Sequence, residues 1–547
     1  MDDTALIREF QDQPPPLLIK ELLRTAMDTQ SNAEIVYAEG SRYSYPTLNE
    51  RIHRLASALS SLGLRHGMTV GVMDWDTPRY LECFFAVPMM GAVLHTINVR
   101  LSPEQVLYTI NHAEDDILLI NAEFLPLVEK IWEHVEPGKI LVLLNDAPSL
   151  PTTTLKLAGE YEALLKAASP SFDFPDFDEN TRATTFYTTG TTGLPKGVFF
   201  SHRQLVLHTL AIRMELQGKG RGRFNPDDVY MPVTPMFHVH AWGMPYVATS
   251  FGAKQVYPGR YAPDLLVRLI QNEGVNFSHC VPTVLQMILD AAARNQVDLR
   301  GWTVVIGGSA LPRTLCITAL ERGIDIFTGY GMSETCPILT VARPQPHMLN
   351  WPIEQQADAL CKTGRPVPMV QIRVVDEQMQ DVARDGVSRG EIVTRAPWLT
   401  AGYLKDPVNS KALWAGGWLH TGDVAVQEPD GTLKIIDRIK DVIKTGGEWV
   451  SSLDIEDLIL RHPAVAEAAV IGIADPKWGE RPLAIIVVKP DKEVSADDIL
   501  VHLATFSDRG VISRYAIPGR VDFVEQLPKT SVGKLNKRVL RETYTAL

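Results

Sequence analysis

Apolar residues recur at helical spacing in several stretches of the chain. In PTLNERIHRLASALSSLG (46–63), Leu48, Ile52, Leu55 and Leu59 lie three or four residues apart. This period places them on one face, so the stretch predicts an amphipathic helix that ends near its final glycine.

Short apolar runs alternate with these helical stretches. The segment AEIVYAEGSRYSY (33–45) predicts a hairpin of two strands. Five further runs predict buried strands: TVGVMDW (69–75), ILLINA (117–122), KILVLL (139–144), VVIGG (304–308) and IDIFTGYG (324–331). Alternating strands and helices predict parallel sheets covered by helices, which is an α/β fold.

The pattern changes near the charged segment IIDRIKDVIKTGGEW (435–449). We expect a large N-terminal region of layered sheets and helices over 1–438 and a small, mobile α+β domain over 439–547, with the charged segment as the hinge. The elements predicted for the small domain are strands at AEAAVIGI (466–473), PLAIIVVK (482–489) and VDFVEQL (521–527), and helices at DDILVHLATF (497–506) and KLNKRVLRETY (534–544).

Composition restricts the class of protein. The chain has 547 residues, 45% of them hydrophobic, and a net charge of −12. Its length exceeds what one hydrophobic core usually organises. Nucleic acid and anionic membrane surfaces attract basic proteins, so neither is expected as the main partner. The five cysteines lack the pair spacing of a zinc or redox motif.

The most apolar stretch, residues 80–97, is interrupted by Glu82 and Pro88. It therefore predicts a buried core helix rather than a membrane span. The first residues, MDDTALIREFQDQPPP, are acidic and lack the basic and apolar segments of a signal peptide. We expect a cytoplasmic protein.

The loop YTTGTTGLPKG (187–197) is the first candidate for chemistry. Its small hydroxyls, free backbone N–H groups and lysine suit phosphate oxygens. A P-loop needs glycine directly before the lysine and Ser or Thr directly after it, but Pro195 and Gly197 stand there. The loop predicts a nucleotide site between two strands, and its plainer alternative is a hairpin turn without a ligand.

Five further motifs follow this loop in order: FHVHAW (237–242), GYGMSET (329–335), WLHTGD (418–423), DRIKDVIKTGGE (437–448) and PKTSVGKLNK (528–537). In this order the chain resembles the adenylate-forming superfamily of acyl-CoA synthetases, luciferases and peptide synthetase adenylation domains, from about residue 30 onward. HVHAW and GGEWVSS are most similar to medium- or long-chain fatty acyl-CoA ligases and to ligases for 3-methylmercaptopropionate. The resemblance implies adenylation of a carboxylic acid by ATP, release of pyrophosphate, and acyl transfer to CoA, with Mg²⁺ as cofactor.

The resemblance also implies catalytic and nucleotide-binding roles. Lys534 bridges the carboxylate and the α-phosphate, Glu334 and Thr188 hold Mg²⁺, Tyr330 lies along the adenine, and Asp423 accepts hydrogen bonds from the ribose hydroxyls. Taken alone, the same residues could be a solvated glutamate, a turn aspartate and a basic tail. The other residues implied to bind the nucleotide are Thr188, Thr189, Gly190, Thr191, Thr192, Lys196, Gly308, Ser309, Thr328, Gly329, Ser333, Arg438 and Lys440. Most family members have Thr where Ser333 stands, and Ser keeps the hydroxyl.

The acyl and CoA sites are implied in the same way. His238 and Trp242 lie four residues apart, hence on one face if this piece is helical. His238 borders the acyl carboxylate, and Trp242 either blocks or gates the acyl tunnel, whereas a buried core His and Trp would look identical. The acyl-binding set is His238, Trp242, Gly308, Gly331 and Met332, and the CoA-binding set is Lys444, Gly446, Gly447 and Trp449. Gly307 and Gly308 are expected where a side chain would clash.

We therefore predict an ATP-dependent acid–CoA ligase for a short- or medium-chain acid, a fatty acid or 3-methylmercaptopropionate. A long-chain ligase and an enzyme that loads a carrier protein remain alternatives, as do a luciferase-like oxygenase and a regulatory nucleotide-binding protein. No carrier-domain pattern follows the small domain, which favours free CoA. Similar proteins are commonly dimers, so a homodimer is expected.

Overall fold

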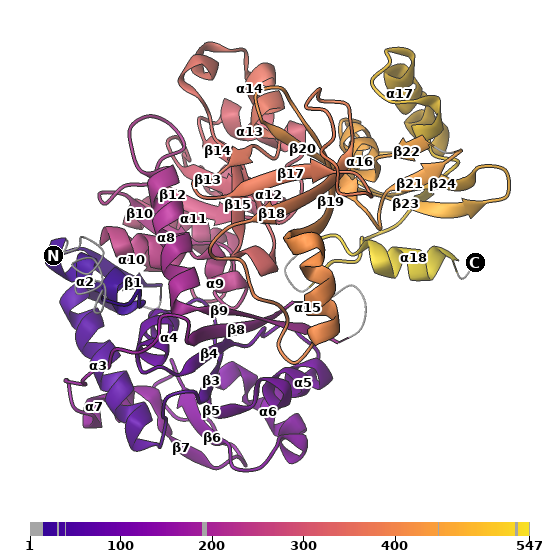
Figure 1. The fold of residues 1–547 in the computed structure, drawn as a ribbon. Helices are drawn as coiled ribbons and strands as arrows, with labels where there is room; N and C mark the ends of the chain where they lie inside the picture. Colours follow the sequence, from indigo (N-terminus) through magenta and orange to yellow (C-terminus); the bar gives the residue numbers. More distant parts are fainter. Residues whose placement is uncertain are drawn as a thin grey trace, which may run out of the picture.

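The computed structural model describes residues 15–29, 32–38, 40–188, 194–446, 448–530 and 534–545. They form four sheets with helices around them, and the C-terminal elements lie together at one side of the molecule (Figure 1). The predicted α/β fold with a smaller C-terminal α+β domain is confirmed.

A seven-stranded sheet, in the order β7-β6-β5-β3-β4-β8-β9, occupies the N-terminal region. All its neighbouring strands are parallel except β8 and β9, which pair antiparallel with Thr188 opposite Lys196. The YTTGTTGLPKG loop therefore joins two strands, as predicted, and the structure shows that they pair antiparallel. The strands are β3 Thr69–Met73, β4 Val93–Thr96, β5 Asp115–Asn121, β6 Ile140–Leu144, β7 Leu157–Glu160, β8 Arg182–Thr188 and β9 Lys196–Ser201.

A nine-stranded sheet has the order β16-β15-β14-β13-β12-β10-β11-β1-β2. Its central strands are parallel, and the predicted hairpin at its edge is confirmed by the antiparallel pairing of β1 and β2. The strands are β1 Glu34–Tyr37, β2 Arg42–Ser44, β10 Val229–Pro232, β11 Lys254–Tyr257, β12 Phe277–Cys280, β13 Thr303–Ile306, β14 Asp325–Gly331, β15 Ile338–Ala342 and β16 Arg365–Pro366.

Helices cover both sheets. Helix α4 is buried over its whole length and contacts β3, β4 and β8 of one sheet and β1 of the other. The predicted helix over 80–97 is only partly right, because Gly91, with a φ of +74°, turns the chain before β4 begins. No helix in the described part of the chain is long and apolar enough to span a bilayer. The helices are α2 Lys20–Thr29, α3 Tyr45–Ser61, α4 Pro78–Met89, α5 Pro103–Ala113, α6 Leu125–Ile131, α7 Tyr161–Ala167, α8 His202–Leu216, α10 Met244–Phe251, α11 Pro263–Glu273, α12 Pro282–Asn295, α13 Arg313–Glu321 and α14 Ile353–Leu360.

A four-stranded antiparallel sheet, β17-β18-β19-β20, precedes the C-terminal domain. Its strands are β17 Gln371–Val375, β18 Gly390–Arg395, β19 Leu419–Gln427 and β20 Leu433–Arg438, with α15 Pro407–Leu413 between β18 and β19. Strand β20 ends at Arg438, which is the position predicted for the end of the large region.

The C-terminal domain is a five-stranded sheet with its own apolar cores on its two faces. Its elements are β21 Ile443–Thr445, β22 Glu448–Val450, α16 Ser452–Leu460, β23 Val465–Asp475, β24 Gly479–Val488, α17 Ala496–Asp508, β25 Arg520–Phe523 and α18 Lys537–Thr545. The last helix was predicted to begin at Lys534, which is wrong. The Thr530 N–H donates to the Lys534 carbonyl oxygen (2.7 Å), and Leu535 pairs with Lys529 in an isolated antiparallel bridge, so Lys534 and Leu535 lie outside the helix.

A buried ionic network joins β20 to the C-terminal domain. The Lys537 ammonium contacts the Glu456 carboxylate at 2.7 Å and donates to the Ser452 hydroxyl, which in turn donates to Asp437. Asp437, Glu456 and Lys537 are each less than a tenth exposed. The Lys537 ammonium therefore compensates the charge of two buried carboxylates, Glu456 directly and Asp437 through Ser452.

We expect Lys537→Met to lower the free energy of unfolding of the C-terminal domain by about 3–5 kcal/mol, because it leaves two buried carboxylates without a cation. Denaturant unfolding followed by hydrogen exchange in α16 and α18 measures this. The matched control is Lys529→Met, whose exposed pair with Glu467 is worth about 0–1 kcal/mol. Equal losses in the two variants would contradict the assignment.

Candidate active site

Three of the predicted site residues follow the carboxyl ends of parallel strands in the nine-stranded sheet. His238 follows β10, Gly307 follows β13, and Glu334 follows β14. In open α/β sheets this edge is where ligands bind, because loops diverge there and leave a crevice. The topology therefore brings together residues that lie almost a hundred positions apart.

A small pocket of about 30 Å³ lies at this edge. Its lining comes from loops after β4, β10, β11 and β12, from α12, and from the C-terminal domain. The lining residues are Arg100, Val233, Thr234, Pro235, His238, Trp242, Tyr261, Val281, Val284 and Lys534. About two water molecules would fill such a volume.

Lys534 is carried into this pocket by the C-terminal domain. Burial and the nearby Arg438 guanidinium lower the pKa of Lys534 to about 8, while the carboxylates of Asp423 and Glu334 act in the opposite direction. The structure thus brings Lys534 close to the other residues predicted for nucleotide chemistry. At pH 7 its ammonium is still mostly charged.

Two adjacent glycines make this approach possible. A Cβ on Gly308 would lie 2.9 Å from Lys534 Cε, and a Cβ on Gly307 would lie 2.7 Å from the Gly329 carbonyl oxygen and 2.9 Å from the Trp242 ring. Gly331 is tighter still, since a Cβ there would overlap the carbonyl oxygen of Pro337. A side chain at either glycine of the pair would therefore clash with protein atoms, while their place beside the adenine and the acyl group stays a prediction.

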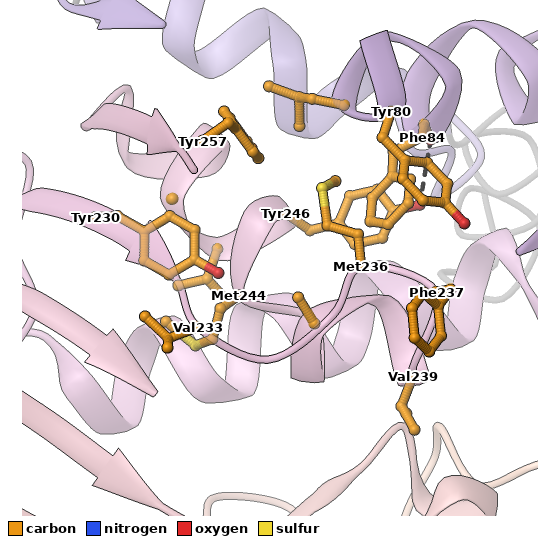
Figure 2. Close-up of a cluster of buried hydrophobic side chains, with 14 of the residues drawn as sticks. Tyr80, Phe84, Tyr230, Val233, Met236, Phe237, Val239, Met244, Tyr246 and Tyr257 are labelled. Carbon is orange, nitrogen blue, oxygen red and sulfur yellow. Dashed lines mark hydrogen bonds between the residues drawn. The ribbon is translucent and has the colours of Figure 1, made fainter. Parts of the chain in front are cut away.

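His238 and Trp242 both line the pocket, although the turn between them is not the ordinary helix assumed from their spacing. Residues Val239–Trp242 (α9) all have φ between +47° and +58°, which is a left-handed turn. Left-handed conformation costs about 1–2 kcal/mol for each residue with a side chain. Burial holds the turn in place: Val239 and the preceding loop belong to the apolar cluster with Tyr80 and Phe84 (Figure 2). Strain of this kind is typical of functional sites.

The Trp242 indole separates the pocket from a second, smaller cavity. Its ring is tilted against His279 with centroids 5.0 Å apart, and it is 7% exposed. The second cavity has about 10 Å³ and is lined by Ile212, Glu215, Leu216, Trp242, Met244, His279, Val305, Phe327, Ile338 and Val341. The Trp242 side chain therefore lies between the pocket that contains Lys534, which has polar lining residues, and a cavity with a mostly apolar lining.

His238 is neutral in this site. Burial, Lys534 and Arg100 lower its pKa to about 3. It can accept or donate a hydrogen bond near a carboxylate without adding a positive charge.

Tyr330, Asp423 and Arg438 form a second group. The Tyr330 hydroxyl donates to Asp423 at 2.8 Å, and the Arg438 guanidinium lies 3.4 Å from the other carboxylate oxygen. Asp423 and Arg438 face each other across β19 and β20. Burial raises the pKa of Asp423, and Arg438 and Tyr330 act against that rise.

Glu334, Lys196 and Tyr403 form a third group. Glu334 lies in a short 3₁₀ turn, Ser333–Thr335, and its carboxylate accepts a hydrogen bond from the Tyr403 hydroxyl. Burial raises the pKa of Glu334, and Tyr403, Arg438 and Lys196 oppose the rise. Lys196 is the first residue of β9.

The other residues predicted for the site differ in how far they are buried. Ser333 is half-buried and follows directly before Glu334 in the chain. Ser309 and Lys440 are exposed. The Thr328 hydroxyl donates to the Lys362 carbonyl oxygen. Gly329 is half-buried in β14, and Met332 packs partly against the main core. Five predicted residues lie outside the described part of the chain: Thr189, Gly190, Thr191, Thr192 and Gly447.

The described residues predicted to bind CoA, Lys444, Gly446 and Trp449, are not among those that line the Lys534 pocket. Lys444 and Trp449 face each other across β21 and β22, with the ammonium 5.4 Å from the ring centroid. Trp449 packs on the apolar residues of the four-stranded sheet. A Cβ on Gly446 would lie 3.0 Å from the ring of Trp478. No motif in the sequence pointed to Trp478.

Arg100, Tyr261 and Tyr403 were also missed. Each stands in a loop without a motif of recognised chemistry, and only the folded chain brings it to the site. Tyr261 donates to the buried Asp76, whose pKa burial raises to about 7. The Gly-Tyr pair in AGYLKD (401–406) is the one weak sequence signal for Tyr403.

The chain matches two family models and several known proteins. The family model of the AMP-binding enzyme matches residues 23–404, and that of the AMP-binding enzyme C-terminal domain matches residues 454–534. The chain is 40% identical to the long-chain-fatty-acid–CoA ligase of Thermus thermophilus, over 92% of this chain and 91% of that protein. It is 39% identical to the 3-methylmercaptopropionyl-CoA ligase of Ruegeria lacuscaerulensis, over 97% of both chains.

The fold is also that of a solved structure. The anthranilate CoA ligase AuaEII in complex with anthranoyl-AMP superposes with a TM-score of 0.86 at 23% identity, over 98% of this chain and 99% of that chain.

Proposed function

Because this chain belongs to the AMP-binding enzyme family and is an AMP-forming acid–thiol ligase, we propose that the acid it activates is short or medium in length, a fatty acid or 3-methylmercaptopropionate. The superfamily resemblance of its six motifs is confirmed. The observation that carries the proposal is the position of Trp242, which leaves about 30 Å³ beside Lys534. This space holds about two water-sized groups, so it favours the short end of that range over a long chain.

In the first half reaction, the carboxylate of the acid attacks the α-phosphate of ATP and pyrophosphate leaves. Lys534 contacts both anions and reduces their repulsion as charge builds up on the phosphorus oxygens. Neutral His238 borders the carboxylate. Asp423 accepts hydrogen bonds from the ribose hydroxyls, and the Tyr330 ring lies along the adenine.

Mg²⁺ fits the residues around Glu334. A single buried carboxylate, completed by substrate phosphates and the Thr188 hydroxyl, is a donor set of hard oxygens that Mg²⁺ prefers. When bound, the ion neutralises charge on the phosphates. Lys196, Arg438 and Lys440 supply further positive charge to the same ligand.

In the second half reaction, the CoA thiol attacks the acyl carbon and AMP leaves. We assign this step to a second orientation of the C-terminal domain, in which the loop with Lys444, Gly446, Gly447 and Trp449 replaces Lys534. The support is that Lys444 and Trp449 lie away from the pocket while Lys534 occupies it. The domain would pivot after β20, near the proposed boundary between residues 438 and 439.

A long-chain acid is the second candidate, and one observation favours it. The apolar cavity behind Trp242 would extend the pocket if the indole swung aside. The Thermus relative carries the name of a long-chain ligase.

An acid panel tests the proposal. We expect CoA-dependent AMP formation to be greatest with short or medium acids in a series from two to sixteen carbons that includes 3-methylmercaptopropionate. Reactions without CoA and without acid are the controls. A maximum at twelve carbons or more would overturn the assignment and support Trp242 as a gate.

We also propose that the enzyme acts as a homodimer in the cytoplasm. The support is the superfamily resemblance for the dimer, and for the location the five free, scattered cysteines, which suit a reducing compartment.

A further inference from the structure

Tyr403 lies between two groups of opposite charge. Its hydroxyl donates to Glu334 Oε1 at 2.7 Å, and the Lys196 ammonium lies 4.7 Å from its ring centroid. Lys196 also acts electrostatically on Glu334, because its positive charge opposes the rise in the pKa of that carboxyl. Tyr403 therefore contacts both charged groups, the Glu334 carboxylate through its hydroxyl and the Lys196 ammonium through its ring, and acts as a spacer between them.

The backbone around Tyr403 is tied to the same two elements. The Leu404 N–H donates to the Gly197 carbonyl oxygen at 2.8 Å, and the Thr400 N–H donates to the Glu334 carbonyl oxygen at 3.0 Å. The Thr400 hydroxyl donates to the Phe199 carbonyl oxygen at 2.9 Å. The segment thus links β9, which ends the phosphate-loop motif, to the turn that carries Glu334.

We propose that Tyr403 is a positioning residue for adenylation, which holds the Glu334 carboxylate and the Lys196 ammonium apart and directs both toward the triphosphate. The inference rests on the proposed function of these two residues. Lysine and glutamate side chains have several rotamers, and ordering them in advance lowers the entropy lost when the nucleotide binds. Without the spacer, the two opposite charges could pair with each other and withdraw from the ligand.

Binding of Mn²⁺·ATP, followed by electron paramagnetic resonance in the absence of acid, gives a readout independent of turnover. We expect Tyr403→Phe, which keeps the ring, to weaken Mn²⁺·ATP binding about tenfold, the effect of one hydrogen bond to a charged group. Tyr403→Leu also removes the cation–π contact and should weaken it about thirtyfold. Tyr45→Phe is the matched control, because it removes a buried hydroxyl that donates to Ala253, away from the site.

Steady-state kinetics supply a second readout. Tyr403→Phe should raise the KM for ATP in pyrophosphate exchange, leave the KM for the acid within twofold, and spare thioester formation from preformed acyl-AMP. An equal loss in both half reactions would show a merely structural role and overturn the proposal.

The pair Tyr403→Phe and Glu334→Gln tests whether Tyr403 acts through the carboxylate. In the Glu334→Gln background, Tyr403→Phe should add less than a twofold loss of Mn²⁺·ATP affinity, whereas a full tenfold loss would overturn the proposal. Because Mn²⁺·ATP binding needs no acid, these results stand even if every acid in the panel fails as a substrate.

Discussion

Lys534→Ala should lower the rate of acyl-adenylate formation about 10²–10³-fold, the usual loss when one preorganised electrostatic group is removed from an active site. Thioester formation from preformed acyl-AMP and CoA should fall only a few-fold. The ammonium is needed where two anions approach each other, and that approach occurs only in the first half reaction. Pyrophosphate exchange and single-turnover thioester formation measure the two steps separately.

The control for this variant is Lys529→Ala. Lys529 lies five residues earlier in the same segment, but it pairs with Glu467 on the surface. It should leave both half reactions within twofold of the wild type. If Lys534→Ala slowed both steps equally, the two orientations of the C-terminal domain would be contradicted.

The pH profile gives a second measurement on Lys534. Its pKa of about 8 in the free enzyme lies below the usual lysine value, so the charged, active form dominates below pH 8 and is lost above it. The kcat/KM for adenylation should therefore fall about tenfold per pH unit on the alkaline side, since this parameter reports free-enzyme pKa values. In Lys534→Arg, the fall in kcat/KM for adenylation should begin only above pH 10, because arginine stays charged.

Trp242→Ala should change chain-length preference more than overall activity. The indole separates the pocket from the apolar cavity, so its removal would join the two. Burying four additional methylenes is worth about 3 kcal/mol at about 0.8 kcal/mol each, or roughly 100-fold. We therefore expect the ratio of kcat/KM for octanoate to that for butyrate to rise about 100-fold, measured by AMP formation.

The matched control for Trp242→Ala is Trp351→Ala, which removes an indole that is 36% exposed on the surface. That variant should leave the octanoate-to-butyrate ratio unchanged. A Trp242→Ala ratio within twofold of the wild type would mean that the indole neither closes nor gates the acyl site.

Much of the fold followed from local patterns. The hairpin at 33–45 and the helix ending near Gly63 form as predicted, because the period of apolar residues reflects which face each element buries. Two boundaries that differ from the prediction, at residues 90–97 and 534–536, lie where a positive-φ glycine turns the chain or where Lys534 and Leu535 pair with earlier residues. Such turns depend on backbone geometry that periodicity does not contain.

The residues of the candidate site also fall into two groups, those that the sequence could name and those that it could not. Lys534, Glu334 and Asp423 could be named because each lies in a contiguous motif with recognisable chemistry. Tyr403 could not, since its partner Glu334 is 69 residues away and meets it only through tertiary packing. The left-handed turn at Val239–Trp242 was equally hidden, because four residues with side chains adopt it against their intrinsic preference.

The sequence by itself determined the reaction class, the α/β architecture with a smaller C-terminal domain, and the residue types that carry charge. Only the tertiary structure decided that Lys534 occupies the pocket while Trp449 lies elsewhere, and that Trp242 stands between two cavities. The physical reason is that motifs record local chemistry, whereas distances between remote side chains and the size of a cavity depend on how complete elements pack.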